Sequence, residues 1–381
     1  MRKHFPLIRE FVHRADMYLF ALCCICTIFG MIIISSATAS YENSYRYLII
    51  QGIAFLIGIG LFVLFTVIDI DVFADNWLFL FVASIAFILI LIPFGVGDEE
   101  TGNKAWLRFF GIGIQPTEVV KIVFIVLLAK QLTYFKERGT LNSVFPVFTY
   151  VAHFGIFFVL IFAVTRDMGS DLIFFAIFAV ELFMAGVKLY WFAIGAASIA
   201  AVFPFFWTHV LNDRYRDRIM APYDPTIDPN NEDINWQANQ SKIALASGRL
   251  TGTGLYNGTQ TQSNALSQKH TDFIFAAVGE ELGMIACVII IALLMLIVLR
   301  CVQVGLRSNN TMGCLICFGM AAFIAFQTFI NIGMCIGLTP VIGLTLPFFS
   351  YGGSSLFSAF AAMGIVSGIK YRPSPRRFYS L

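Results

Sequence analysis

The chain has 381 residues, of which 58% are hydrophobic and 13% are charged, and its mean hydropathy is +0.79. This composition excludes a soluble enzyme of several domains and is typical of a protein that crosses a membrane many times. The formal net charge of +2 is too small to indicate a nucleic acid partner. The useful unit is therefore the membrane span, which needs about 20 apolar residues.

Ten apolar segments follow one another along the chain. Because the backbone must satisfy its own hydrogen bonds in lipid, and because these runs do not alternate as barrel strands do, we expect helices. The sequence predicts an all-α polytopic membrane protein with ten transmembrane helices, forming one integral membrane domain over residues 1–381. The segments run roughly over 17–36, 46–69, 77–96, 116–135, 144–164, 170–187, 190–209, 273–299, 312–336 and 346–369.

The first segment needs a check against a secretion signal, because basic residues precede it and Ala37-Thr38-Ala39 resembles a cleavage site. The run from about Tyr18 to Ile34 is long for a signal peptide, and further spans follow it, so we predict an uncleaved span. The eight Cys lie in or beside apolar segments, which argues against a disulfide framework. The pair Cys314 and Cys317 has no nearby His or second pair, which argues against a metal or redox site.

Lysine and arginine in the short connections indicate the orientation. Most of them fall on the same side of the membrane as the N-terminus, although the connection at 69–75 is acidic. The positive-inside rule therefore places both termini in the cytoplasm. Residues 210–272 then form a large extracytoplasmic loop between the seventh and eighth spans, and loops of this length are usually functional.

The stretch SQKHTDFIFAAVGEELG, residues 267–283, places three carboxylates near the start of the eighth span. Asp272 stands at the lip, where it can cap the helix, act as a general base on a substrate hydroxyl, or do both. On a straight helix Glu280 and Glu281 lie roughly 12–13 Å farther along and are turned by about 80° and 180°, so they cannot pair with Asp272. We expect them to face other helices and bond there, with a part in the site as the alternative.

The fourth span begins QPTEVVK, in which Glu118 and Lys121 are three residues apart and can pair on one helix face. The pair is either a neutralised structural element or the lining of an outward cavity. Farther on, the long loop carries Arg216, Arg218 and Lys242, which are either solvated charges or partners for an anion such as a diphosphate. Its glycines at 252, 254 and 258 lack a preceding strand and are not a dinucleotide fingerprint.

The last outside segment and tenth span, GLTPVIGLTLPFFSYGGSS, interrupt apolar sequence with proline and glycine. Broken backbone at membrane depth is tolerated only beside protein or a cavity. This segment is therefore the wall of a site or a hinge.

These motifs, together with KAWLRF at 104–109, strongly resemble the SEDS family (shape, elongation, division and sporulation). The resemblance implies a peptidoglycan glycosyltransferase that polymerises lipid II on the outer face of the bacterial cytoplasmic membrane. It implies that Asp272 of the HTD motif is the catalytic base on the acceptor 4-hydroxyl. It also implies a class B penicillin-binding protein transpeptidase as partner, together with elongation-complex membrane proteins, and it allows a divalent cation, Mg or Mn, without requiring one.

The candidate residues for substrate binding or structural support come from these same motifs. They are Glu118, Lys121, Trp106, Arg108, Arg216, Arg218, Gln240, Ser241, Lys242, His270, Thr271, Ser350, Gly352, Gly353 and Ser354. One departure is visible at 166–170, where Arg166 stands in place of the proline that is usual in this family motif, which puts the local loop geometry in question.

Two other functions fit the same outward cavity. A lipid II flippase would use it without chemistry, and a scaffold would only recruit the transpeptidase. Within the enzyme reading, the short N-terminus and the QPTEVVKI motif favour the elongation type over the division and sporulation types.

Overall fold

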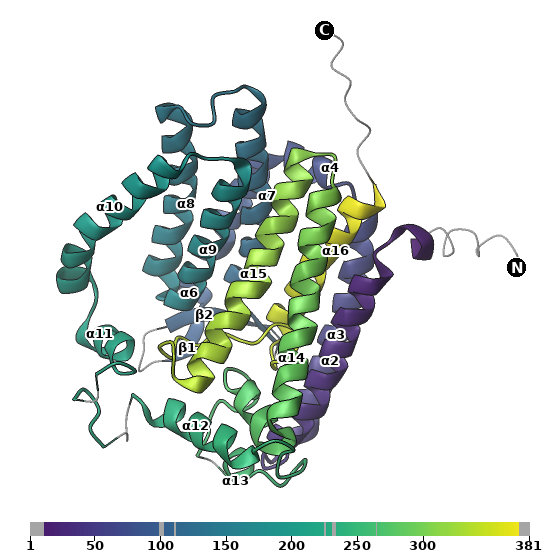
Figure 1. Cartoon of the computed structure of the whole chain (residues 1–381), viewed down its shortest axis with the longest axis vertical. Coiled ribbons are helices and arrows are strands. Elements are labelled where there is room, and N and C mark those ends of the chain that lie inside the picture. Colours follow the sequence, from purple (N-terminus) through teal and green to yellow (C-terminus); the bar gives the residue numbers. More distant parts are fainter. Residues whose placement is uncertain are drawn as a thin grey trace, which may run out of the picture.

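The computed structural model describes residues 11–98, 103–109, 112–224, 226–230, 234–263 and 265–372. The basic residues expected on the cytoplasmic side at 2, 3, 9, 376 and 377 lie outside this part. In the described part, long helices run side by side as a bundle, and short helices and strands gather at its lower end in Figure 1.

The helices occupy most of the predicted spans. They are α2 (Met17–Ala37), α3 (Ser44–Val67), α4 (Ile70–Asp75), α5 (Trp77–Leu89), α6 (Leu91–Phe94), α7 (Pro116–Glu137), α8 (Val144–Thr165), α9 (Met168–Ala185), α10 (Leu189–Phe205), α11 (Asp213–Met220), α12 (Trp236–Gly248), α13 (Thr259–Gln262), α14 (Ile274–Arg307), α15 (Thr311–Ile336) and α16 (Gly353–Tyr371), with a π-helical turn, η1, at Phe206–Val210.

By length and composition, nine helical segments in the described residues can cross a membrane, when α5 is taken together with α6 and α10 with η1. The predicted fourth span is formed as α7, but it carries Glu118, Lys121 and Lys130 along its length and is too charged to be counted on composition. The total of ten spans therefore stays a prediction. The tenth span was predicted to begin near residue 346, but α16 begins only at Gly353, because residues 340–352 take a non-helical path.

The bundle is not uniformly packed. Helix α16 is the most enclosed of these nine apolar segments, with most of its residues buried, and it lies against α3. Helix α14 packs on α15, which also packs on α9. Helix α10 instead stands apart at the left of Figure 1 and has no buried residue. A helix that is apolar on all sides and unpacked faces lipid.

A small antiparallel sheet covers part of the lower end, in the order β1 (Val96–Asp98), β2 (Asn103–Phe109) and β3 (Ile112–Ile114). Val96 pairs with Trp106, and Leu107 pairs with Ile114. Sequence reasoning treated this region as a connection and did not predict the strands.

Helix α14 is kinked at Gly283, whose backbone has φ 79° and ψ −178°. A side chain at this position would strain the backbone, and a Cβ would lie 2.4 Å from the amide nitrogen of Gly252. The residues after the kink bond to the long loop, since the Met284 amide donates to the Arg249 carbonyl at 2.9 Å. The straight helix assumed for residues 273–299 is therefore wrong.

The long loop folds back onto the first turns of α14 and is held there by Glu280. Its buried carboxylate accepts the amides of Gln260 at 2.8 Å and Thr261 at 2.7 Å, and also the hydroxyls of Thr259 and Thr261. Glu281 accepts Gln262 at 2.9 Å. Both carboxylates anchor structure, as expected, and the helix that they face is α13 of the long loop rather than another membrane span.

We predict that Glu280→Gln detaches this loop. Two charged acceptor oxygens become one neutral acceptor and one donor, so at least two hydrogen bonds to a charged group are lost, each worth about 1.5–3 kcal/mol. Limited proteolysis should cut residues 249–263 faster in the variant, and thermal unfolding should begin at a lower temperature. The exposed Glu137→Gln serves as the control, and equal cleavage rates in both variants would contradict the anchor.

Candidate active site

The segment that carries Asp272 lies beside the broken segment before α16. The hydroxyl of Ser350 donates to the Thr271 carbonyl at 2.6 Å, and the amide of Tyr351 donates to the His270 carbonyl at 2.8 Å. The Asn331 amide donates both to the Asp272 carbonyl at 2.7 Å and to the Leu344 carbonyl at 2.6 Å. The backbone under Asp272 is therefore fixed by α15 and by residues 344–351.

The side chain of Asp272 does not cap α14. The residue at the cap position is Phe273, and no side chain accepts a hydrogen bond from the first turn. Asp272 is partly exposed, and its Oδ2 would lie 3.7 Å from a Cβ placed on Gly343. The carboxylate is thus available for chemistry rather than occupied as a cap.

The surroundings hold the pKa of Asp272 up. This pKa is raised to about 6, mainly because the carboxyl is removed from water and also because of the charge of Asp167, while a hydrogen bond from Thr271 opposes the shift. A carboxylate with a pKa near 6 is deprotonated at neutral pH and yet basic enough to take a proton from a positioned hydroxyl.

His270 is enclosed by the aromatic rings of Tyr41, Tyr47 and Tyr351, with ring centroids 5.2–5.6 Å away. Burial and the neighbouring Lys269 lower the pKa of His270 to about 4, so the imidazole is neutral at physiological pH. Lys269 is itself buried and donates to Ser40 at 2.8 Å and to the carbonyls of Thr261 and Ser263. His270 and Lys269 therefore position the HTD segment rather than supply a proton.

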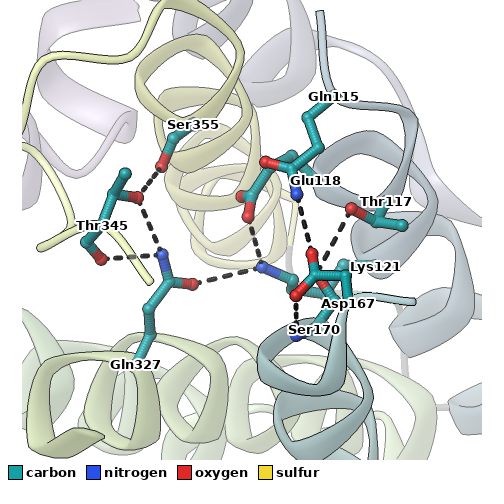
Figure 2. Close-up of polar contacts among 9 residues, drawn as sticks. All are labelled: Gln115, Thr117, Glu118, Lys121, Asp167, Ser170, Gln327, Thr345 and Ser355. Atoms are coloured by element: carbon teal, nitrogen blue, oxygen red, sulfur yellow. Dashed lines mark hydrogen bonds and ion pairs between the residues drawn. The ribbon is translucent and has the colours of Figure 1, made fainter. Parts of the chain in front are cut away.

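Glu118 and Lys121 form the predicted pair, and both are buried. Lys121 Nζ lies 3.0 Å from Glu118 Oε1 and 3.2 Å from Gln327 Oε1, and it stands over the ring of Phe323. Gln327 in turn donates to the carbonyl of Thr345 at 3.0 Å, and the Thr345 hydroxyl meets that of Ser355 at 3.0 Å. Figure 2 shows this chain of contacts linking α7, α15 and the segment before α16.

A second, separate group of hydrogen bonds centres on Asp167, which caps α9. Its carboxylate accepts the Ser170 amide at 3.1 Å, the Ser170 hydroxyl at 2.6 Å and Gln115 Nε2 at 2.9 Å (Figure 2). Burial raises the pKa of Asp167, and the hydrogen bonds from Ser170 oppose this. The negative charge of Asp167 also helps to raise the pKa of Asp272.

The segment before α16 is pinned along its length. Gln51 donates to the Ser350 carbonyl at 3.1 Å and accepts the Gly352 amide at 3.2 Å. Ser350 is buried and is part of this framework, and Gly353 and Ser354 begin α16 as buried residues. Of the two roles predicted for this segment, these contacts favour the wall of a site.

The other candidates are more scattered. Trp106 on β2 is partly buried, with ring carbon Cε3 3.1 Å from a Cβ placed on Gly113, and Arg108 is exposed. On α12, the Ser241 hydroxyl donates to the Cys335 carbonyl at 2.8 Å, so Ser241 supports packing. Gln240 beside it is buried, and Lys242 is exposed at the edge of a pocket that Arg218 also lines.

The two loop arginines have different surroundings. The guanidinium of Arg216 donates to the carbonyls of Leu211 and Thr208 at 2.9–3.1 Å and pairs with Asp213 at 3.3 Å. Arg216 therefore closes the end of η1, and its part in anion binding is not supported. Within the described residues Arg218 has no such bonds, and it lines a small pocket with Arg166, Asp167 and Tyr215.

Sequence reasoning did not single out Gln327, Asn331 and Gln115, which carry much of this framework. A signal was present, because Gln327 and Asn331 lie four residues apart in an otherwise apolar helix and so share one face. In the described part of the chain, no three His, Cys, Asp or Glu side chains gather as a metal site, and the divalent cation stays a prediction.

Together these features define a polytopic membrane protein with a carboxylate-centred site at one end of its bundle. The profile of the FtsW, RodA and SpoVE family, described as cell cycle proteins, matches residues 16–374, and the chain belongs to this family, the SEDS family. A probable peptidoglycan glycosyltransferase FtsW from Geobacter metallireducens is 31% identical over 98% of this chain and 99% of its own length. The peptidoglycan glycosyltransferase MrdB of Escherichia coli K12 is 33% identical over 75% of each chain.

Two solved structures share the fold. A chain from a peptidoglycan synthase complex superposes with a TM-score of 0.75 at 24% identity, covering 93% of this chain and 97% of that one. The rod shape determining protein RodA of Thermus thermophilus gives a TM-score of 0.67 at 22% identity, covering 95% and 98%. The likeness confirms the expected polytopic helical fold.

We predict that the Glu118–Lys121 pair is more costly to break than to remove. Lys121→Met leaves a buried carboxylate without its cation, which should cost about 3–5 kcal/mol of unfolding free energy. The double variant Glu118→Gln/Lys121→Met removes both charges and should recover part of that loss. Thermal unfolding of the purified variants in detergent measures this, and additive losses in the double variant would contradict direct coupling.

Proposed function

We propose that this chain is a peptidoglycan glycosyltransferase that polymerises lipid II, with Asp272 as the general base. The observation that carries the proposal is the Asp272 carboxylate itself. The backbone of Asp272 is held by Asn331, and its side chain does not cap α14. Its pKa of about 6 suits proton transfer at neutral pH. The family membership and the names of the relatives support the same activity.

In the proposed reaction the acceptor's 4-hydroxyl oxygen attacks the anomeric carbon of the donor sugar. The new bond forms between that oxygen and carbon, and the hydroxyl proton passes to Asp272. The bond from the anomeric carbon to the diphosphate oxygen breaks, and its electron pair leaves with the undecaprenyl diphosphate. Because a diphosphate leaves without being protonated, one carboxylate suffices, whereas glycosidases that expel a poor leaving group use two.

We further propose that the partner is a class B penicillin-binding protein, supported by the fold likeness to a chain of a peptidoglycan synthase complex. The chain is a multi-pass membrane protein. We place both termini in the cytoplasm and the site outside, as the distribution of Lys and Arg predicts. A role in elongation stays our prediction, with division as the alternative because the FtsW relative aligns over 98% of this chain.

A pH profile tests the base. Asp272 must be deprotonated to act, so kcat/KM should fall as the pH drops below about 6 and level off above it. Asp167→Asn removes a negative charge that raises the pKa of Asp272, while asparagine can still cap α9. The midpoint should therefore move to lower pH in this variant and stay in place in the exposed control Glu42→Gln. A midpoint that rises or does not move in Asp167→Asn would contradict the electrostatic link.

Polymer formation tests the activity. The purified protein with its cognate transpeptidase is incubated with labelled lipid II, and the glycan lengths are resolved on a gel. We expect polymer from the wild type and none from folded Asp272→Asn. Polymer from neither would favour a flippase or a scaffold, and polymer from both would remove Asp272 from the mechanism.

A further inference from the structure

Arg166 is the residue that departs from the family motif, and its backbone is unusual. It ends α8 in the left-handed region with φ 54° and ψ 30°. Proline cannot take this conformation, because its ring holds φ near −65°. The connection between α8 and α9 is therefore shaped differently from one that contains the usual proline, and the arginine side chain is exposed at its tip.

A small pocket opens beside this connection, at the same end of the bundle as Asp272. Arg166, Asp167, Met168, Tyr215, Arg218 and Ile219 line it together with Ile342. The Tyr215 hydroxyl donates to the Arg166 carbonyl at 3.2 Å, which ties α11 to the connection and brings the two arginines to one pocket. Neither guanidinium has a carboxylate partner in the described part of the chain, unlike Arg216, which pairs with Asp213.

The charge balance of the pocket favours an anion. Its one carboxylate, Asp167, already accepts bonds from Ser170 and Gln115. Helix α9 begins at Met168 in the pocket lining, so the positive end of its dipole also lies there. Two free guanidiniums at a helix start match the fork geometry and the charge of phosphate oxygens.

The pocket adjoins the base. Gly169, the second residue of α9, packs so closely on residue 342 that a Cβ would lie 2.9 Å from the Ile342 carbonyl oxygen. The next residue, Gly343, faces Asp272 Oδ2. A donor sugar whose anomeric carbon lies beside the acceptor hydroxyl at Asp272 can therefore place its diphosphate in the pocket.

We propose that Arg166 and Arg218 form the subsite for the diphosphate of the donor lipid, and that Arg166 is a specificity-determining residue of this chain. This inference rests on the proposed function. When the bond between the anomeric carbon and the diphosphate oxygen breaks, the leaving group gains one negative charge, and the two guanidiniums stabilise it. The pocket binds the diphosphate of the donor lipid, and not its sugar or its polyprenyl tail.

Binding measured without turnover tests the subsite. Undecaprenyl diphosphate, undecaprenyl phosphate and undecaprenol are titrated against the full-length protein in detergent, with tryptophan fluorescence as the readout. The wild type should prefer the diphosphate. Arg166→Gln should weaken diphosphate binding about tenfold, as expected for losing a hydrogen bond to a charged group, and should weaken monophosphate binding less. The diphosphate affinity of Arg166→Lys should lie between those of the wild type and Arg166→Gln, because lysine keeps the positive charge but loses the two parallel donors of the guanidinium.

Arg249→Gln is the matched control, since Arg249 is also an exposed arginine with a positive φ, 49°, but does not line the pocket. The subsite would be overturned if Arg166→Gln weakened the binding of all three lipids equally, or did not weaken the binding of any of them. The proposed function would stand in that case if the wild type polymerises lipid II. A wild type that makes no polymer would count against the proposed function. Preferential binding of the diphosphate, lost with Arg166, would still support the subsite in that case.

Discussion

The buried ammonium of Lys121 is the constraint on which the site depends. A cation removed from water must be compensated, and Lys121 meets this need with Glu118 on its own helix and Gln327 on α15. Gln327 also bonds Thr345, and one turn farther along α15 Asn331 bonds both Leu344 and Asp272. The bonds that compensate Lys121, together with those of Asn331, thus fix α7, α15 and the segment before α16 relative to Asp272.

The long loop is part of this architecture rather than an appendage. Two buried charges of opposite sign hold it, Glu280 through loop amides and hydroxyls, and Lys269 through loop carbonyls. Lys269 immediately precedes His270, so the same contacts that close the loop also place the HTD segment. The site is therefore formed by membrane helices together with a loop that is hydrogen-bonded to them through Glu280 and Lys269. By contrast, α10 is unpacked and leaves the bundle open to lipid on that side.

Local pattern predicted the spans and the Glu118–Lys121 pair, because apolar length and a three-residue spacing are properties of the chain itself. The departures all depend on contacts between distant residues. Gly283 kinks α14 because the backbone of residues 249–252 lies against it, and Glu280 turns to loop residues about 20 positions earlier. The sequence allowed Arg216 to bind an anion, but in the structure its guanidinium donates to a carbonyl at the end of η1. Asn331 carried a usable signal, but its two acceptors could not be known from sequence.

The central claim is that Asp272 receives the hydroxyl of the acceptor and that the Arg166–Arg218 pocket receives the diphosphate of the donor. A structure of the protein with lipid II bound, in the Asp272→Asn variant to prevent turnover, tests this most directly. We expect an acceptor sugar hydroxyl within about 3 Å of residue 272, which is hydrogen-bond reach for proton transfer, and a donor diphosphate on the two guanidiniums. An acceptor whose hydroxyl lies away from residue 272, or a donor whose diphosphate contacts other cations, would contradict this claim.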